Sequence, residues 1–183
     1  FKLWIDLLFS VQDSILWLPA MPSQAIQNLK KECIALGMDK NRLIFSFYEG
    51  LKEDHHSKIR LADIFLDSFP YGAHSTASDF LRAGVPVVTL RGSSIANQVA
   101  SSILINLNLS ELITTTEYDY KNLAIKLATY PSHLKEIKMK LIENVKNSSL
   151  YNIKEYASSI ESGYIHVYDR LHNNLPPDHI EAI

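Results

Sequence analysis

Residues 66–79 read LDSFPYGAHSTASD, and this stretch passes from an apolar strand end through a proline and glycine turn into a hydroxyl-rich helix start. The first amides of a helix have no intrahelical partner, and the helix dipole places partial positive charge beside them. His74, Ser75 and Thr76 add side-chain donors at the same place. The stretch therefore predicts an anion site, with a phosphate or pyrophosphate as its guest.

A second interpretation of this stretch needs no ligand. Thr76 and Asp79 fit the T-x-x-D pattern of a capping box, in which side chains satisfy the free amides of the helix start. The local sequence leaves both interpretations open, so the rest of the chain has to decide between them.

Short apolar runs alternate with helical patterns along the first two thirds of the chain, which is typical of βαβ units and a parallel sheet. Ligands of such sheets bind beyond the carboxyl ends of the strands, where residues 66–79 lie. The pattern predicts an α/β fold with strands at 14–18, 42–47, 64–67, 86–90 and 112–114. Helices are expected at 23–36, 76–83, 95–107, 117–129, 132–147 and 153–171.

The helix expected at 23–36 has recognisable ends. Ser23 is a plausible N-cap, and Gly37 supplies the left-handed residue that ends a helix. Cys33 lies on the apolar stripe of this helix, which indicates packing in the core.

Composition describes an ordinary globular chain. It has 183 residues, 46% of them hydrophobic and 21% charged, with a formal net charge of −2. Such values predict one domain with a substantial core, here with a helical appendage. The charge gives no basic excess to follow a nucleic-acid backbone, and no apolar run is long enough to span a membrane.

The single cysteine excludes an intramolecular disulfide and a cysteine-rich metal site, and it favours a reducing compartment. The start, FKLW, has no initiator methionine and no signal-peptide pattern. We therefore expect a piece of a longer, cytoplasmic protein.

Common catalytic signatures are absent from the sequence: G-x-G-x-x-G, G-x-x-x-x-G-K-[ST], H-E-x-x-H and G-x-S-x-G. A nucleotide could still be held without them, by the helix start at Ser75 and Thr76 together with a base pocket built elsewhere.

Several motifs in a fixed order carry a resemblance to the C-terminal catalytic half of the O-GlcNAc transferases, a family that includes Spindly-type proteins and bacterial relatives. These motifs are ILWL (15–18), KEDH (52–55), LADIFLD (61–67), HSTASD (74–79), AGVPVVTL (83–90), ANQVASS (96–102) and SLYNIKEY (149–156). The resemblance covers residues 1–172, with nearly gapless spacing.

This resemblance implies a GT-B glycosyltransferase, in which two Rossmann-like lobes face each other across a cleft. Residues 1–172 would form the donor-binding lobe and 173–183 a C-terminal tail. The implied reaction is inverting and metal-free, so we expect no cofactor, and UDP-GlcNAc is the expected donor substrate. The implied partners are a protein acceptor, the enzyme's own N-terminal lobe and a tetratricopeptide array.

Four site residues follow from the resemblance at the helix start. His74, Ser75 and Thr76 match the family's H-T-T triplet, whose groups contact the donor diphosphate and stabilise the leaving group. Ser75 replaces a threonine but keeps the hydroxyl. Asp79 matches an acidic residue that hydrogen-bonds the ribose. The resemblance places no catalytic acid or base within these 183 residues.

Three further positions match nucleoside-binding residues of the family. His55 corresponds to the histidine that stacks on uracil, although the adjacent His56 makes the register arguable. Lys52 corresponds to a lysine that contacts uridine. Lys58 stands where many members carry arginine, so it keeps the charge but lacks the planar guanidinium.

The chain departs from the family pattern in the segment after residue 90. Relatives show P-G-E-[TR]-[FL]-A-S-R-V, whereas residues 91–99 read RGSSIANQV. Ser93 stands in place of the glutamate, and Asn97 and Gln98 replace serine and arginine. We expect a phosphate contact at this spot to be weaker, unless Arg91 rebuilds it.

Three hypotheses remain for the function. The chain is the donor lobe of a protein O-GlcNAc transferase, a GT-B lobe for another nucleotide sugar such as GDP-fucose, or a non-catalytic binding or scaffold module. The family's diphosphate-binding lysine and its acceptor-side lobe lie upstream of Phe1 in relatives. We therefore expect the fragment alone to transfer no sugar.

Overall fold

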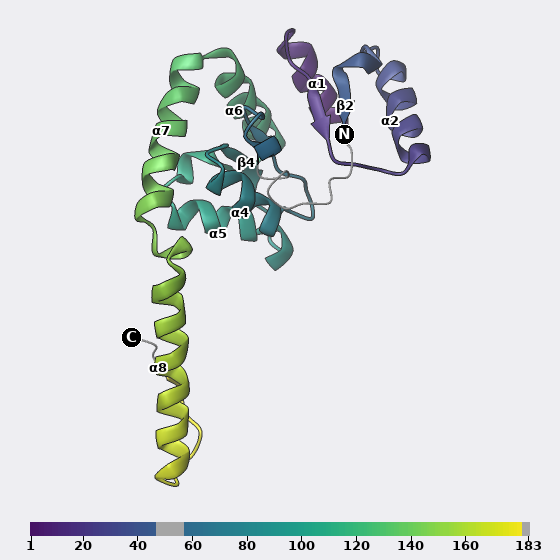
Figure 1. The fold of residues 1–183 in the computed structure, drawn as a ribbon. Helices are drawn as coiled ribbons and strands as arrows, with labels where there is room; N and C mark the ends of the chain where they lie inside the picture. The colour runs from purple at the N-terminus through teal and green to yellow at the C-terminus, as the bar shows by residue number, and fades with distance from the viewer. Residues whose placement is uncertain (47–56, 181–183) are drawn as a thin grey trace.

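The protein is described by a computed structural model that covers residues 1–46 and 57–180. It has the expected α/β architecture, in which short parallel strands are flanked by helices (Figure 1). The helices whose bounds lie within these ranges include α1 (Lys2–Ser10), α2 (Ser23–Ala35), α4 (Ser75–Arg82), α5 (Val99–Asn106), α6 (Glu117–Thr129), α7 (Pro131–Asn147) and α8 (Ile153–His172). Short 3-10 helices are η1 (Lys40–Arg42), η2 (Ile95–Asn97), η3 (Ser110–Leu112) and η4 (Ser149–Tyr151).

The strands lie where the sequence predicts them but are shorter. They are β1 (Leu16–Leu18), β2 (Leu43–Phe45), β3 (Phe65–Leu66), β4 (Val87–Leu90) and β5 (Ile113–Thr114). In the described part of the chain they form two parallel sheets, one of β1 and β2 and one in the order β3-β4-β5. The carboxyl ends of β3, β4 and β5 therefore share one edge, and the loops that follow them are neighbours.

The structure differs from the sequence prediction at the N-cap of α2 and within the helix expected at 95–107. The N-cap of α2 is Pro22 and not Ser23, because the proline ring fixes φ at −56° with an extended ψ of 145°, and the helix starts directly after it. The helix expected at 95–107 is divided into η2 and α5, with Gln98 at the break.

The end of α2 follows the sequence prediction. Gly37 has φ +82°, which an L side chain rarely adopts. The amide of Gly37 bonds to the carbonyl of Ile34 at 2.9 Å, and that of Met38 bonds to Cys33 at 3.0 Å. This pair of bonds is a Schellman motif, and it closes the helix with Cys33 fully buried.

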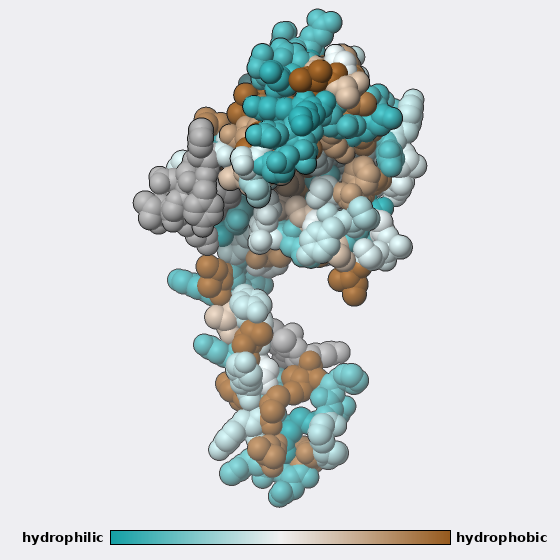
Figure 2. All heavy atoms as spheres, turned by 90° about the vertical axis from the view of Figure 1, so that its right-hand side faces the viewer, coloured by the Kyte–Doolittle hydropathy of each residue, from teal (hydrophilic) through white to brown (hydrophobic). Residues whose placement is uncertain are grey.

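Helix α8 extends away from the rest of the molecule as a single rod (Figure 1). None of its residues is buried, and apolar side chains are visible along it in Figure 2. Its large exposed apolar residues are Ile153, Tyr156, Ile160, Tyr164, Ile165, Val167, Tyr168 and Leu171. Among the described residues, no helix is both long enough and apolar enough to cross a membrane.

Two apolar clusters form the core. The larger one surrounds the β3-β4-β5 sheet and includes Leu81 of α4 and Val88 of β4, both fully buried. The smaller one lies around β1, β2, α1 and α2. Trp4 of α1 packs against both clusters, and its indole Nε1 donates to the Tyr120 hydroxyl of α6 at 3.3 Å. Helix α1 therefore joins the two sheets.

A chain of buried polar groups crosses the carboxyl edge of the larger sheet. The hydroxyl of Thr89 in β4 donates to Oδ2 of Asp67 at 2.7 Å, and the hydroxyl of Thr114 in β5 donates to the Thr89 carbonyl at 2.9 Å. Asp67 directly follows β3, is 1% exposed, and its Oδ1 accepts the Ala73 amide at 2.6 Å. The Tyr120 hydroxyl donates to the Asp67 carbonyl at 2.9 Å. These bonds tie the loop before α4 to the sheet.

We expect Leu81→Ala to lower the free energy of unfolding by about 2–5 kcal/mol, because it leaves a cavity where α4 meets the core. Leu61→Ala is the matched control, since Leu61 is 78% exposed, and it should change stability by less than about 0.5 kcal/mol. Urea unfolding measures both. Equal losses in the two variants would contradict the assignment of the core.

The Asp67 carboxyl should make stability depend on pH. Burial raises its pKa above the ordinary value of 3.8, because desolvation outweighs the hydrogen bonds from Thr89 and Ala73. The folded state then holds the proton more tightly than the unfolded state. The stabilisation from this group is complete below pH 3.8 and is lost as the pH rises through the folded pKa.

Asp67→Asn isolates this effect. Its Oδ1 can still accept the Ala73 amide, and its amide can donate to Thr89, so the geometry is kept without the charge. We expect the free energy of unfolding of the wild type, relative to this variant, to fall as the pH rises from 3.8 through the raised pKa of the folded state. Urea titrations at several pH values measure the difference, and a difference that rises with pH would show that the charged form is favoured.

Candidate functional site

The start of α4 exposes free backbone donors. Its N-cap is His74, which makes no side-chain cap, and the first intrahelical bond runs from the Ser78 amide to the His74 carbonyl at 3.2 Å. The amides of Ser75, Thr76 and Ala77 precede this bond and so have no intrahelical partner. The side chains of Ser75 and Thr76 are exposed, whereas Ala77 is fully buried. The helix start therefore presents amides and hydroxyls on its solvent side.

The capping-box interpretation of this helix start is wrong. A capping box needs Thr76 at the N-cap, but Thr76 is the second residue of the helix. The pattern T-x-x-D is present, yet it lies two residues too far along the chain. The carboxylate of Asp79 thus lies one turn inside α4, where it cannot close the helix start.

The loop before α4 is folded around the Asp67 carboxylate. Besides the Ala73 bond, the Ser68 hydroxyl donates to the Tyr71 carbonyl at 2.8 Å. At Gly72 an added Cβ would lie 3.3 Å from both Asp67 Oδ2 and the Ala96 carbonyl oxygen. Only a residue without a side chain fits easily there. This close approach brings the loop after β4 against the loop after β3.

The ring of His74 is held on two sides. Its Nε2 lies 3.1 Å from the carbonyl oxygen of Ala96, and its face stacks on Tyr71 with ring centroids 5.2 Å apart at 23°. A carbonyl oxygen can only accept, so Nε2 carries the proton and donates. The tautomer of the neutral ring is thereby set, and Nδ1 is its acceptor nitrogen.

The loop after β4 is locked by side-chain amides. Asn97 is 5% exposed; its Oδ1 accepts the Gly92 amide and its Nδ2 donates to the Pro70 carbonyl at 2.9 Å. Gln98 Nε2 donates to the Gly92 carbonyl at 3.0 Å. The sequence predicts that Asn97 and Gln98 weaken a phosphate contact at this spot. In the structure the side-chain amides of both residues bond to backbone groups of the two loops.

Sequence reasoning missed this role of Asn97. Its partner Pro70 lies 27 residues away, and no periodicity reports such a contact. The sequence feature that could have indicated this role is the glycine at position 92. The structure explains it, since an added Cβ there would lie 2.9 Å from Asn97 Oδ1. Arg91, the expected substitute for lost charge, is exposed and holds β5 through its backbone amide, which bonds to the Thr114 carbonyl at 2.8 Å.

The remaining expected site residues are not all at the start of α4. Asp79 is half-buried on α4, and Lys58 places its ammonium 5.7 Å from the ring centroid of Trp17 in β1. Lys52 and His55 lie outside the described residues. The structure thus groups His74, Ser75 and Thr76, puts Asp79 on the same helix, and sets Lys58 against the smaller sheet.

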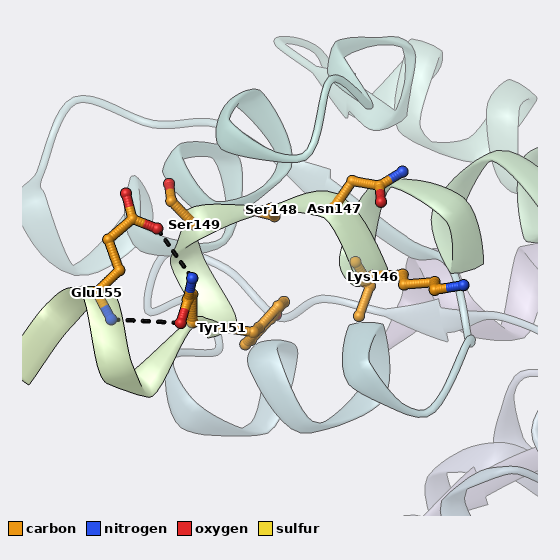
Figure 3. A pocket seen from close by; sticks show the side chains of 8 residues that line it. Lys146, Asn147, Ser148, Ser149, Tyr151 and Glu155 are labelled. Carbon is orange, nitrogen blue, oxygen red and sulfur yellow. Dashed lines mark hydrogen bonds between the residues drawn. The ribbon is translucent and has the colours of Figure 1, made fainter.

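A separate hollow lies where α7 ends and α8 begins (Figure 3). It is open to solvent, has a volume of about 510 Å³, and its lining includes Lys146, Ser149, Tyr151 and Glu155. The Tyr151 hydroxyl lies 3.4 Å from the Ser78 hydroxyl in the first turn of α4, and burial raises its pKa. None of the expected site residues that the structure describes lines this hollow. It adjoins α4 through Tyr151.

The part of the chain that the structure describes shows no evident metal site. No group of three or more His, Cys, Asp or Glu side chains there could hold a metal ion.

Comparisons with known proteins identify relatives over most of the chain. The family model of Glycosyl transferase family 41 matches residues 1–160. A UDP-N-acetylglucosamine–peptide N-acetylglucosaminyltransferase of Caenorhabditis elegans is 34% identical over 178 residues, which are 97% of this chain and 15% of that protein. A probable UDP-N-acetylglucosamine–peptide N-acetylglucosaminyltransferase SPINDLY of Hordeum vulgare is 31% identical, covering 92% of this chain and 18% of that protein.

A solved structure shares the fold. A mutant of the O-GlcNAc transferase of Thermobaculum terrenum matches with a TM-score of 0.81 and 25% identity, over 89% of this chain and 32% of that one. The chain therefore spans less than a third of the length of each of these three relatives. Because the family match extends over residues 1–160, the chain belongs to glycosyl transferase family 41.

Proposed function

We propose that this chain is the donor-binding lobe of an inverting protein O-glycosyltransferase, which transfers N-acetylglucosamine from UDP-GlcNAc to serine or threonine of protein acceptors. The observation that carries the proposal is the start of α4, where free amides and two exposed hydroxyls face solvent in a chain of this family. The name of the worm relative, which is 34% identical, supports the donor and the peptide acceptor.

In this proposal the start of α4 stabilises the leaving group. Negative charge develops on the nucleotide diphosphate as the glycosidic bond breaks, and fixed amide and hydroxyl donors stabilise it most at that point. Ser75 and Thr76 supply hydroxyls, the helix dipole adds partial positive charge, and the ring of His74 borders the same space. No metal or other cofactor is needed for this role.

The nucleoside contacts belong to the same proposal. Asp79 would bond the ribose, while Lys52, His55 and Lys58 would contact the uridine part. The acceptor and the catalytic acid or base would come from the enzyme's N-terminal lobe, and a tetratricopeptide array would present acceptor proteins. We place the enzyme in the cytoplasm, consistent with its single buried cysteine.

Nucleotide competition on the full-length enzyme tests the donor. We expect UDP and UDP-GlcNAc to bind, and GDP and GDP-fucose to compete poorly, because a base pocket distinguishes the two nucleosides. Calorimetric titration with each of the four compounds measures this. Selective GDP binding would replace the donor by a guanosine sugar, and a folded enzyme that binds none of the four would support a scaffold role.

Thr76→Ala tests the site itself. A hydroxyl bond to a charged group contributes about 1.5–3 kcal/mol, so UDP affinity should fall about 10- to 100-fold. Thr129→Ala is the matched control, because Thr129 is exposed on α6 and its hydroxyl bonds to the Ile125 carbonyl of the same helix at 2.8 Å. UDP titration of both variants measures the effect. Unchanged affinity in Thr76→Ala would remove Thr76 from the diphosphate site.

A further inference from the structure

We infer that Asn97 is a positioning residue for donor binding, because its buried amide holds the loop after β4 in the place from which the Ala96 carbonyl fixes the ring of His74. The inference rests on the proposed function. Asn97 need not touch the donor in this role. It holds the loop after β4 in place, at a position where the chain departs from the family pattern.

Asn97 makes three contacts, two within its own loop and one to the loop after β3. Oδ1 accepts the amide of Gly92 from its own loop, and Nδ2 donates to the carbonyl of Pro70 in the loop after β3. The Asn97 backbone amide also bonds to the Ser94 carbonyl at 3.0 Å. Both ends of the side chain and the backbone are therefore engaged, which fixes the direction of the peptide unit that precedes Asn97.

That peptide unit carries the carbonyl of Ala96, which accepts two bonds. One comes from the amide of Gly72 at 3.0 Å and the other from Nε2 of His74 at 3.1 Å. Ala96 and Asn97 together contact positions 70, 72 and 74, which alternate along the opposite loop. If the side-chain amide of Asn97 lost its partners, the peptide unit before it could shift and move the Ala96 carbonyl. The His74 ring would then lose the acceptor that sets its orientation.

The pairing with Gly92 makes asparagine specific at this position. An added Cβ on Gly92 would lie 2.9 Å from Oδ1 and 3.0 Å from Cγ of Asn97, so the glycine allows the approach that the amide needs. A serine at position 97 has one short hydroxyl and cannot reach both the Gly92 amide and the Pro70 carbonyl. A substitution at Asn97 and one at Gly92 should therefore weaken UDP binding in the same way.

A double-mutant cycle on the full-length enzyme tests the inference. Asn97→Ala should weaken UDP binding about 10-fold in the wild-type background, and by less than about twofold when His74 is already alanine, because the effect passes through the His74 ring. The KM for the sugar donor should rise by a similar factor, while the KM for the acceptor stays the same. Calorimetry and steady-state kinetics measure these values.

Two further variants complete the design. Gly92→Ala displaces the Asn97 amide from the other side and should show the same loss of UDP affinity with the same dependence on His74. Asn106→Ala removes an exposed amide from α5, where the Asn106 side chain bonds to the Ser102 carbonyl of the same helix, and should leave UDP affinity unchanged. Thermal unfolding of each variant separates loss of the fold from loss of positioning.

The outcomes distinguish the two proposals. If the wild-type enzyme binds UDP but Asn97→Ala weakens binding equally with and without His74, the positioning role is overturned and the proposed function stands. The same holds if Asn97→Ala, still folded, binds UDP as tightly as the wild type. If the folded wild-type enzyme binds no UDP, both proposals fall.

Discussion

The buried carboxylate of Asp67 is the interaction on which the shape of the site depends. Taking a charged group out of water is unfavourable, so a buried carboxylate needs donors on its oxygens. Here one oxygen takes the Thr89 hydroxyl from the neighbouring strand, and the other takes the Ala73 amide six residues along the chain. Satisfying Asp67 forces the loop to turn back on the sheet, and this turn aims the start of α4 outward.

The two loops at this edge of the sheet divide their polar groups into two sets. The buried set, which includes Asp67, Thr89 and Asn97, is bonded within the protein. The exposed set consists of the first amides of α4 and the hydroxyls of Ser75 and Thr76, and it faces solvent. Since the buried groups hold the backbone in place, the exposed donors are fixed before any ligand arrives. Such preorganisation makes electrostatic stabilisation effective.

The sequence predicted the parts of the fold that depend on local pattern. Runs such as Val87 and Val88 identified β4, and the left-handed Gly37 ended α2 as expected. The capping box failed because T-x-x-D specifies a spacing but not a register, and the helix began at Ser75. Contacts between loops were beyond prediction. Asn97 meets Pro70 only because β3 and β4 are neighbours, and this adjacency is a property of the folded sheet.

The geometry of His74 limits what that residue can contribute in the proposed complex. Its Nε2 donates to the Ala96 carbonyl, so this proton is already used within the protein. The amides of Ser75 and Thr76 and the two hydroxyls are therefore the donors that remain for an anion at the helix start. The His74 ring, packed on Tyr71, shapes the space beside these donors, and its fixed orientation matters for binding through this shape.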